Sequence, residues 1–508
     1  MKELTIPIRT GSGISLYEQI YDYIRHEIID GKISSREKLP STRLLAKYLQ
    51  VSRSTVDLAY DQLVSEGYVE AVPGSGYYVC DIKTVFFEFD GEKASKASEK
   101  TAEQGKCPMG GERAYCSADA VANRQIEVYP YDFSPYAIEW PQSSMNAWRK
   151  ATKAMLQEEM EGLFLPGDPL GEENLRQVIS DYLHRARGVA CTKEQIIVGA
   201  GNEYLLMLLY QILEGERSVA MESPTYRQAY QIFKNLGWKV APIPMDESGM
   251  VMQDLEGSGA QLAYIMPSHQ FPMGNVMPMK RRMELLSWAG EKEGRYIIED
   301  DYDSEFRYKG KPIPSLQGSD PYGKVIYLGT FSKSIAPAIR VSYMVLPPPL
   351  MEQFRQRCGF YSSTVSRIQQ HTLYHFMEDG YFERHLNRVR GIYRLRHDAL
   401  LAELKGRPWV KRVWGENAGL HVLVELHIQK PEEELIAEAK AAGIRVYGLG
   451  EYSIRPEEEP PGQSERKENP VLLLGYAKLT EAEIREGVER LTGVLNKTNT
   501  TFEGKDAP

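Results

Sequence analysis

The chain has 508 residues, a length that predicts two or three domains and leaves room for a large apolar core. Its formal net charge of −9 at pH 7 excludes a protein that is basic throughout, so any contact with nucleic acid depends on a local positive patch. We find no signal peptide and no apolar run of the roughly 18 residues that a membrane span needs, so we expect a cytoplasmic protein. The cysteines lack CxxC spacing, which predicts neither a metal site nor a disulfide framework.

The N-terminal residues begin with two predicted helices. In the first, apolar side chains recur at the spacing of one helix face, at Leu16, Ile20, Ile24 and Ile28. The second helix covers residues 41–48, with Ser41 as a candidate N-cap. Its pattern predicts that three side chains face inward: Leu44, Leu45 and Tyr48.

The third predicted helix follows Ser52, a good N-cap residue, and its inner face consists of Val56, Ala59, Tyr60 and Leu63. This arrangement leaves Arg53, Ser54 and Thr55 exposed on the first turn. Residues 69–79 alternate into a turn and out again, which predicts a small hairpin. Three helices followed by a hairpin have the order of a winged helix-turn-helix, whose third helix enters the major groove of DNA.

A cluster of basic residues supports this prediction. Between residues 36 and 55 the only acidic residue is Glu37, against Arg36, Lys38, Arg43, Lys47 and Arg53. A solvated face of a helical bundle is the alternative interpretation of such a cluster.

The stretches "KLPSTRLLAKYLQVSRSTVDLAYDQLVSEGY" and "PGSGYYV", within residues 14–79, resemble the DNA-binding domain of GntR-type bacterial regulators. The resemblance implies that the protein binds double-stranded operator DNA. By the same resemblance the contacts come from Arg43, Arg53, Ser54 and Thr55, with Gly76 at the tip of the wing.

Two stretches have the composition of a linker or loop. Residues 81–130 show no lasting periodicity and contain the polar stretch "DGEKASKASEKTAEQGK", which predicts a flexible linker between residues 1–80 and a domain over 131–498. The stretch "RPEEEPPGQSERKENP" at 455–470 predicts a surface loop.

From about residue 131 onward, apolar runs alternate with helical stretches. The runs are "QIIVGAG", "SVAMESP", "LAYIMPS", "YIIEDDY", "KVIYLGT" and "VSYMVLP". This alternation predicts an α/β domain with a mostly parallel sheet covered by helices on both faces. Ligands of such folds bind at the carboxyl ends of the strands, so the residues after each run are the candidates for a site.

Those strand ends carry a set of groups that suits pyridoxal 5'-phosphate. A lysine amine can form a Schiff base with the cofactor aldehyde, a carboxylate can pair with the pyridine nitrogen, and an arginine can hold the phosphate. Singly each signal is weak, because a lysine after a strand is usually a surface side chain and "EDDYDSE" could be an acidic turn or a metal-binding loop. The groups occur together in chain order as Gly201, Asn202, Tyr226, Asp300, Tyr302, Lys333 and Arg340.

The stretches "LPGDPLGEENLRQVISDYL", "PSHQFPMG", "IIEDDYDSEFRY" and "GTFSKSIAPAIRVSYMV" resemble fold-type-I, aspartate-aminotransferase-like enzymes over residues 131–495. Such enzymes have a large and a small subdomain and form homodimers. A GntR-type domain joined to such a domain is identified as the MocR/GabR class of bacterial transcription regulators.

The second resemblance assigns roles residue by residue. It implies that Lys333 is the aldimine lysine, that Asp300 pairs with the pyridine nitrogen and that Tyr302 contacts the ring oxygen. Tyr226 would stack on the ring, and the phosphate would be held by Thr330, Ser332, Arg340 and the amides of Gly201 and Asn202. The motif "HQFPMG" places His269, Gln270 and Phe271 nearer the ring than Asn275. We further expect the site to lower the pKa of Lys333, through partial burial and the neighbouring Arg340.

These features lead to three hypotheses. The first is a transcription regulator that responds to an amine or amino acid; the second is an active aminotransferase that carries a DNA-binding domain; the third is a sensor of the cofactor itself. Arg445 and Arg455 are candidates for binding an effector carboxylate. GABA-responsive relatives are expected to have arginines near Gln228 and Glu451, so the sequence does not favour GABA as the ligand.

Overall fold

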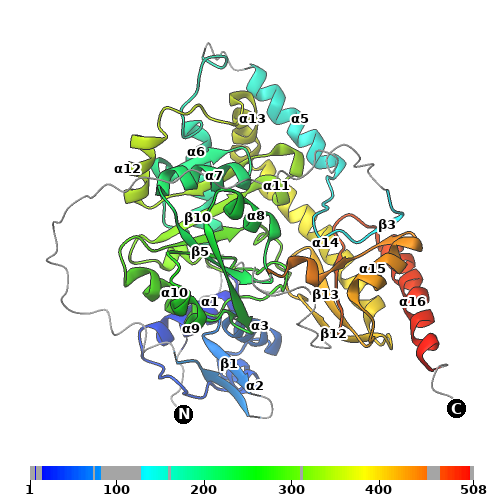
Figure 1. The fold of residues 1–508 in the computed structure, drawn as a ribbon. Helices are drawn as coiled ribbons and strands as arrows, with labels where there is room; N and C mark the ends of the chain where they lie inside the picture. Colours follow the sequence, from blue (N-terminus) through cyan, green and yellow to red (C-terminus); the bar gives the residue numbers. More distant parts are fainter. Residues whose placement is uncertain are drawn as a thin grey trace.

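The computed structural model describes residue 6 and residues 14–72, 75–81, 128–157, 162–308, 313–454 and 469–503, with only the backbone for 497–503. The predicted linker lies mostly outside the described residues, as do Arg455 and most of the predicted loop at 455–470. Figure 1 shows an N-terminal unit in blue, a large domain in cyan to yellow-green, and a small domain in orange and red. Of the helices within the described residues, none is long and apolar enough to cross a membrane.

The N-terminal unit has the predicted order of a winged helix-turn-helix. Helices α1 (Leu16–Ile29), α2 (Thr42–Leu49) and α3 (Arg53–Ser65) precede an antiparallel hairpin of β1 (Val69–Val72) and β2 (Gly76–Val79). Both predicted caps form, because Ser41 Oγ accepts a hydrogen bond from Leu44 N at 3.2 Å and Ser52 Oγ accepts one from Thr55 N at 3.1 Å.

One prediction for this unit is wrong. Leu45 is buried, but Leu44 and Tyr48 are 50% and 51% exposed. The short α2 turns a narrow face of Thr42, Leu45 and Ala46 toward the core, whereas Leu44 and Tyr48, four residues apart, share another face. The apolar character of Leu44 and Tyr48 therefore did not indicate which face of α2 is buried.

The large domain is built on an eight-stranded sheet in which every predicted run forms a strand. The strand order is β4 (Ile196–Gly199), β11 (Ser342–Val345), β10 (Val325–Thr330), β9 (Tyr296–Asp301), β8 (Leu262–Ile265), β5 (Ser218–Ser223), β6 (Lys239–Asp246) and β7 (Gly249–Met250). The pairs from β10 to β6 are parallel, whereas β11, β4 and β7 pair antiparallel with their neighbours. The parallel strands bring their carboxyl ends to one edge.

Helices cover both faces of this sheet, as predicted. One face packs against α7 (Asn202–Leu213), α8 (Arg227–Asn235) and α12 (Pro348–Arg357). The other packs against α6 (Glu173–Arg187), α9 (Met252–Gly257), α10 (Met279–Gly290) and α13 (Arg367–Glu378), with α5 (Gln142–Gln157) alongside. These two layers explain why the central strands are apolar on both sides.

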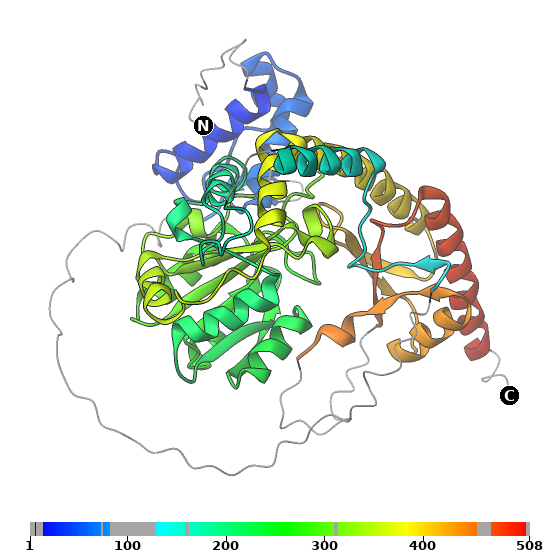
Figure 2. The ribbon, with the colours of Figure 1, turned by 90° about the horizontal axis from the view of Figure 1, so that it is seen from above.

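The small domain has a four-stranded antiparallel sheet in the order β12 (Val410–Trp414), β13 (His421–Leu426), β16 (Val471–Gly475) and β15 (Tyr447–Gly448). It is accompanied by α14 (Tyr381–Leu404), α15 (Glu432–Ala441) and α16 (Glu481–Glu503). The short β3 (Tyr131–Asp132) pairs with β14 (Ile444–Arg445) of this domain. Figure 2 shows the small domain beside the large one, with the β3 segment running between them.

The N-terminal unit packs directly on the large domain. Buried residues of α1, α3 and β1 form one apolar cluster with Met279 and Met283 of α10. The backbone N–H of Met279 donates to the carbonyl of Glu66 at 3.0 Å. Gly67, with φ +75°, lies against Pro278, and an added Cβ would come within 2.7 Å of Pro278 Cβ.

Candidate functional site

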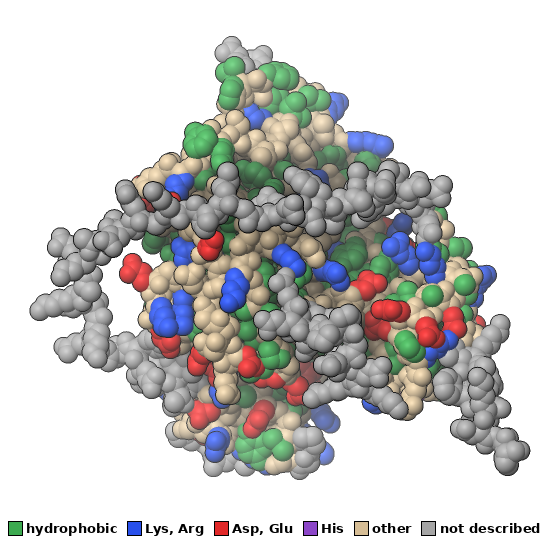
Figure 3. All heavy atoms as spheres, viewed as in Figure 1, with side chains coloured by type: hydrophobic (Ala, Val, Ile, Leu, Met, Phe, Trp, Pro, Cys, Tyr) green, Lys and Arg blue, Asp and Glu red, His purple; other side chains and the backbone are tan. Residues whose placement is uncertain are grey.

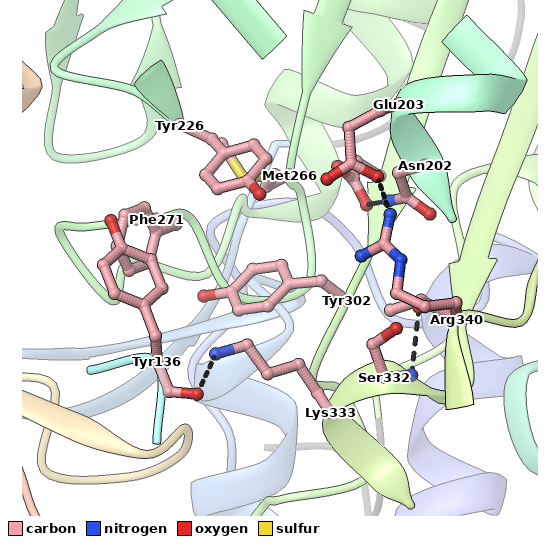
Figure 4. Close-up of a pocket in the computed structure, with 12 residues that line it drawn as sticks. Tyr136, Asn202, Glu203, Tyr226, Met266, Phe271, Tyr302, Ser332, Lys333 and Arg340 are labelled. Atoms are coloured by element: carbon pink, nitrogen blue, oxygen red, sulfur yellow. Dashed lines mark hydrogen bonds and ion pairs between the residues drawn. The ribbon is translucent and has the colours of Figure 1, made fainter. Parts of the chain in front are cut away.

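An inner cavity lies where β9 and β10 end, next to the start of α7. Its lining consists of Tyr136, Asn202, Glu203, Tyr226, Met266, Phe271, Asp300, Tyr302, Thr330, Ser332, Lys333 and Arg340 (Figure 4). The lining contains the side chains of Asn202, Tyr226, Asp300, Tyr302, Thr330, Ser332, Lys333 and Arg340, to which the resemblance assigned contacts with the cofactor, and Gly201 is the N-cap residue of α7 beside it.

Lys333 lies in α11 (Phe331–Ser334), the single helical turn that follows β10. The turn is shaped by Thr330, whose Oγ1 accepts a hydrogen bond from Ser332 N at 3.1 Å. The Lys333 ammonium donates to the carbonyls of Pro135 at 3.2 Å and Tyr136 at 3.3 Å.

Burial lowers the pKa of Lys333 to about 8, while the charge of Asp303 acts in the opposite direction. The direction agrees with the sequence expectation, but Arg340 is not the cause. The Arg340 guanidinium lies 2.6 Å from the Glu203 carboxylate and is neutralised by it.

Asp300 is a buried carboxylate held by two donors. Asn202 Nδ2 donates to its Oδ1 at 3.2 Å, and the Tyr264 hydroxyl donates to its Oδ2. Burial is the main reason that the pKa of Asp300 rises to about 7, against the lowering effect of the Tyr264 hydrogen bond. A cation placed against this carboxylate would restore its ionised form, so the position suits a protonated ring nitrogen.

The start of α7 and Arg340 together form a place for an anion. Gly201 has φ +94°, and a Cβ at this position would collide with the Arg340 guanidinium. Gly201, the N-cap residue, has no side chain that could cap this helix start, and its own N–H donates to the carbonyl of Gly199 at 2.9 Å. A phosphate group would therefore be attracted by the amides that follow it at the helix N-terminus. Arg340 itself has a left-handed backbone, with φ 47°, at the end of the turn after Lys333.

Tyr302 is held by a histidine and an aspartate behind it. Its hydroxyl lies 3.0 Å from His269 Nδ1, which lies 2.9 Å from Asp303 Oδ2. Of the three residues expected near the ring, only Phe271 lines the cavity. Gln270 instead donates from its side-chain amide to the carbonyl of Pro224 at 2.9 Å, and Asn275 is not in the lining.

Three lining residues were missed by the sequence interpretation: Tyr136, Glu203 and Met266. Tyr136 comes from an irregular segment before α5, nearly 200 residues from Lys333 along the chain. Its ring centroid lies 5.2 Å from the Lys333 ammonium. No periodic pattern marks this segment, so only the fold brings it to the site.

An outer cavity of about 640 Å³ adjoins the inner one. Its lining consists of Tyr136, Glu203, Arg227, Gln228, Gln231, Ile232, Tyr447, Glu451 and Tyr452. Arg445, one of the two arginines expected to bind an effector carboxylate, is not in either lining. Its guanidinium lies over the Tyr447 ring at 5.2 Å and 3.8 Å from the Asp132 carboxylate.

A network of buried charges lies behind the inner cavity. Arg187 pairs with Asp301 at 2.7 Å, with both side chains 2% exposed, and donates to Ser268 Oγ at 2.7 Å. Arg282 donates to the carbonyls of Pro267 at 2.9 Å and Pro314 at 2.6 Å. The network therefore fixes the loop that contains His269 and Phe271 from behind.

The predicted DNA-binding residues lie on an open side of the N-terminal unit. Arg43 is exposed, and so is Arg53, with a side chain 69% accessible at the start of α3. Ser54 and Thr55 lie beside them, with their hydroxyls 2.8 and 2.7 Å from Ser52 Oγ. Figure 1 shows α2 at the bottom of the molecule, on the side of the N-terminal unit away from the large domain.

Lys38, which precedes α2, adds a further cation next to the wing. Gly76 has φ +124°, and an added Cβ would lie 3.2 Å from Lys38 Cε. Lys38 Nζ lies 5.6 Å from the centroid of the Tyr78 ring. Lys38, which forms an antiparallel bridge with Tyr78, therefore lies beside β2 of the wing.

A winged helix-turn-helix joined to an aminotransferase-type fold defines the class of this protein, and comparison with known proteins agrees. Residues 16–79 match the family model of bacterial regulatory proteins of the gntR family, and residues 135–491 match that of class I and II aminotransferases. The fold is similar to Pyrococcus horikoshii kynurenine aminotransferase, with a TM-score of 0.63 and 23% identity over 75% of this chain and 97% of that one.

Relatives with the same two parts are similar along almost the whole chain. The HTH-type transcriptional regulator YdeL of Bacillus subtilis is 38% identical over 94% of this chain and 96% of its own length. A Rhizobium meliloti protein named "Probable rhizopine catabolism regulatory protein MocR" is 30% identical over 94% of both chains. The chain belongs to this family of HTH-type transcriptional regulators, which join a GntR DNA-binding domain to an aminotransferase-like domain.

Proposed function

We propose that this regulator binds operator DNA through residues 1–80 and responds to an amine or amino acid through residues 131–498, with pyridoxal 5'-phosphate as the cofactor and residues 81–130 as the connection. The effector shifts the DNA-bound state because it binds two arrangements of the protein with different affinity.

The side chains that line the inner cavity suit the chemistry of this cofactor. When bound, pyridoxal phosphate supplies an aldehyde for amines and a ring that accepts electrons. Lys333 would attach to it, Asp300 would pair with the ring nitrogen and Tyr302 would hydrogen-bond the ring oxygen, with Tyr226 stacked on the ring. The phosphate would lie among Thr330, Ser332, Arg340 and the amide of Asn202, since the Gly201 N–H already donates to the carbonyl of Gly199. A bound phosphate would compete with Glu203 for Arg340, which is now paired at 2.6 Å.

The observation that carries the regulatory proposal is the packing of the DNA-binding unit on α10. The helix begins at Met279, whose N–H donates to Glu66 of the DNA-binding unit. One turn further, Arg282 donates to the carbonyl of Pro267, at the start of the loop that carries His269 and Phe271. A shift of that loop on ligand binding would therefore reach the DNA-binding unit through α10.

We also propose a homodimer. The exposed apolar side chains include Leu156 at 65%, Phe164 at 85% and Leu165 at 63%. Figure 3 shows green, hydrophobic side chains at the top of the molecule. A two-fold partner on such a face would bury these side chains and present two DNA-binding units to paired half-sites.

The experiment that tests the proposal is a footprint on the DNA upstream of the protein's own gene, with the cofactor and a panel of amines present or absent. The full chain should protect a site, and protection should shift with one amine. Lys333→Ala should still bind DNA but lose the shift, because covalent attachment needs this amine. An unchanged shift in the variant would contradict the mechanism.

Active transamination is the second candidate, because the lysine, carboxylate and aromatic ring of the inner cavity are all present. Steady-state turnover of about 1 per second or more would favour an enzyme over a regulator. Protection that responds to the cofactor alone, with no amine, would instead indicate a sensor of the cofactor.

A further inference from the structure

A buried histidine outside both cavities is hydrogen-bonded to the turn that carries Lys333. His385 lies in the second turn of α14, is 4% exposed and lines neither cavity. Its Nε2 lies 2.8 Å from the carbonyl oxygen of Ser334, the residue after Lys333 and the last residue of α11. Its Nδ1 lies 2.6 Å from Ser144 Oγ on α5. The imidazole therefore joins three helices, α5, α11 and α14.

These two contacts fix the tautomer of the ring. A carbonyl oxygen can only accept a hydrogen bond, so Nε2 carries the proton and donates it to Ser334. Nδ1 of the neutral ring then accepts from the Ser144 hydroxyl, and Ser144 is itself buried. Burial lowers the pKa of His385, although the hydrogen bond to Ser334 acts in the opposite direction, so the neutral ring is favoured. Both nitrogens are thus satisfied in a single tautomer.

The hydrogen bond from His385 stabilises a turn that is too short to be stable alone. The helix α11 has only four residues, and the last carbonyls of a helix have no partner within it. His385 provides a partner for the carbonyl of Ser334, directly next to Lys333. On the other side of Lys333, Thr330 Oγ1 accepts from Ser332 N. The backbone of the lysine is therefore held on both sides.

The same helix also holds the acceptors of the lysine amine. The Lys333 ammonium donates to the backbone carbonyls of residues 135–136, in the segment before α5. Tyr393, about two turns after His385 on α14, accepts from Glu139 N at 3.1 Å and donates to the Glu139 carbonyl at 3.3 Å. The helix α14 therefore fixes the lysine turn at one point and the segment that receives the amine at another.

The helix α14 belongs to the cores of both domains. Phe382 and Leu386 pack in an apolar cluster of the large domain, whereas Val389 and Leu400 pack in that of the small domain. Figure 1 shows α14, in yellow, running from beside α11 toward the small domain. The turn of Lys333 is thus bonded to the helix that joins the two domains.

We propose that His385 is a positioning residue for Lys333. By fixing the Ser334 carbonyl, it sets the direction in which the lysine amine enters the inner cavity. The inference rests on the proposed function, because the amine is taken to capture the cofactor there. His385 acts through the backbone of α11 and does not line the inner cavity itself.

The rival interpretation is a histidine that only fills space in the core. Trp140 and Phe376 cover the ring, with centroids 5.2 and 6.3 Å from its own. An apolar side chain would fill such a position without any buried nitrogen that needs a hydrogen bond. We favour a role in positioning because the donor at Nε2 is aimed at the residue next to Lys333.

Three variants of the full chain separate these interpretations. His385→Leu removes both hydrogen bonds, His385→Gln keeps an amide N–H close to the place of Nε2, and Ser144→Ala removes only the donor to Nδ1. Stopped-flow absorbance after mixing with pyridoxal phosphate gives the rate of cofactor capture. His385→Leu should slow capture about 10- to 100-fold, because an amine displaced by about 1 Å is poorly aligned for reaction. His385→Gln should restore most of the rate, and Ser144→Ala should cause a smaller loss.

The control is His397→Leu, on the same helix. His397 is also 4% exposed and lines neither cavity, and its Nδ1 lies 3.0 Å from Asp398 Oδ1 on α14 itself. This variant loses a histidine of equal burial, so it should capture the cofactor at the rate of the unchanged chain. Unfolding in urea, followed by tryptophan fluorescence, shows whether each variant is folded.

An unchanged rate in folded His385→Leu would overturn the proposal, as would an equal slowing in His397→Leu or no recovery with His385→Gln. Should His385→Leu not fold, Ser144→Ala decides, because an unchanged rate in that variant would also overturn the proposal. Absence of cofactor capture by the unchanged chain would instead contradict the proposed function itself.

Discussion

Replacing Gly67 by alanine should separate the DNA-binding unit from the large domain. Gly67 follows α3 with φ +75°, and an alanine Cβ would lie 2.7 Å from Pro278 Cβ and 3.2 Å from Met279 N. Carbon atoms pack at about 3.5–4.0 Å, so the two surfaces must move apart by about 1 Å at this point. We therefore expect the docking of the N-terminal unit on α10 to weaken.

The loss of stability expected for Gly67→Ala is the sum of two free-energy costs, one from the backbone and one from packing. A left-handed backbone costs an alanine about 1 kcal/mol relative to glycine. The overlap with Pro278 adds about 1–3 kcal/mol, the usual range for overpacking. Gly237 provides the matched control, because it follows α8 in the same way with φ +83° and an added Cβ would meet no atom within 4 Å. Gly237→Ala should therefore lose only the roughly 1 kcal/mol that a left-handed backbone costs an alanine.

Two measurements distinguish these outcomes. The six tryptophans all lie outside residues 1–80, so their fluorescence in urea reports the large and small domains, while limited proteolysis reports release of the N-terminal unit. Gly67→Ala should be cleaved faster between the domains than Gly237→Ala and should lose the ligand-dependent shift of its footprint. Equal cleavage of both variants, with an intact shift, would refute the role assigned to this contact.

Three further changes test other parts of the structure. Only the neutral amine of Lys333 reacts, so the rate of cofactor capture should rise with pH and level off above about 8. With an unperturbed lysine the rate would continue to rise until the pH reached about 10.4. Stopped-flow absorbance measures this rate. Arg187→Ala should lower the free energy of unfolding in urea by about 3–5 kcal/mol, because it leaves Asp301 buried without its partner; no change would contradict the importance of this pair. Arg53→Ala should weaken operator binding by about 1–3 kcal/mol in gel-shift titrations, with Arg394→Ala as control; an equal loss on unrelated DNA would show a phosphate contact instead of base recognition.

The sequence predicted those parts of the molecule that depend on local patterns. Ser41 and Ser52 cap the helices expected of them, and each apolar run of the large domain forms a strand. The residues at the strand ends meet in one cavity because parallel strands place their carboxyl ends together.

Features that depend on distant contacts were not predictable in this way. Tyr136 lies in an irregular segment, and its place beside Lys333 depends on the pairing of β3 with β14. The ion pair between Arg340 and Glu203 joins residues 137 positions apart. The exposure of Leu44 and Tyr48 depends on which face of α2 meets the core, and an apolar pattern of eight residues leaves that choice open.

The hydrogen bonds from Lys333 to Pro135 and Tyr136 have one more consequence. These carbonyls belong to the first few residues of the aminotransferase-like part, where the chain arrives from the DNA-binding unit. If the Lys333 amine formed a bond to a ligand, it would lose its hydrogen bonds to both carbonyls. Through these two hydrogen bonds Lys333 links the inner cavity to residues 135 and 136, so a ligand that engaged the amine would weaken that link.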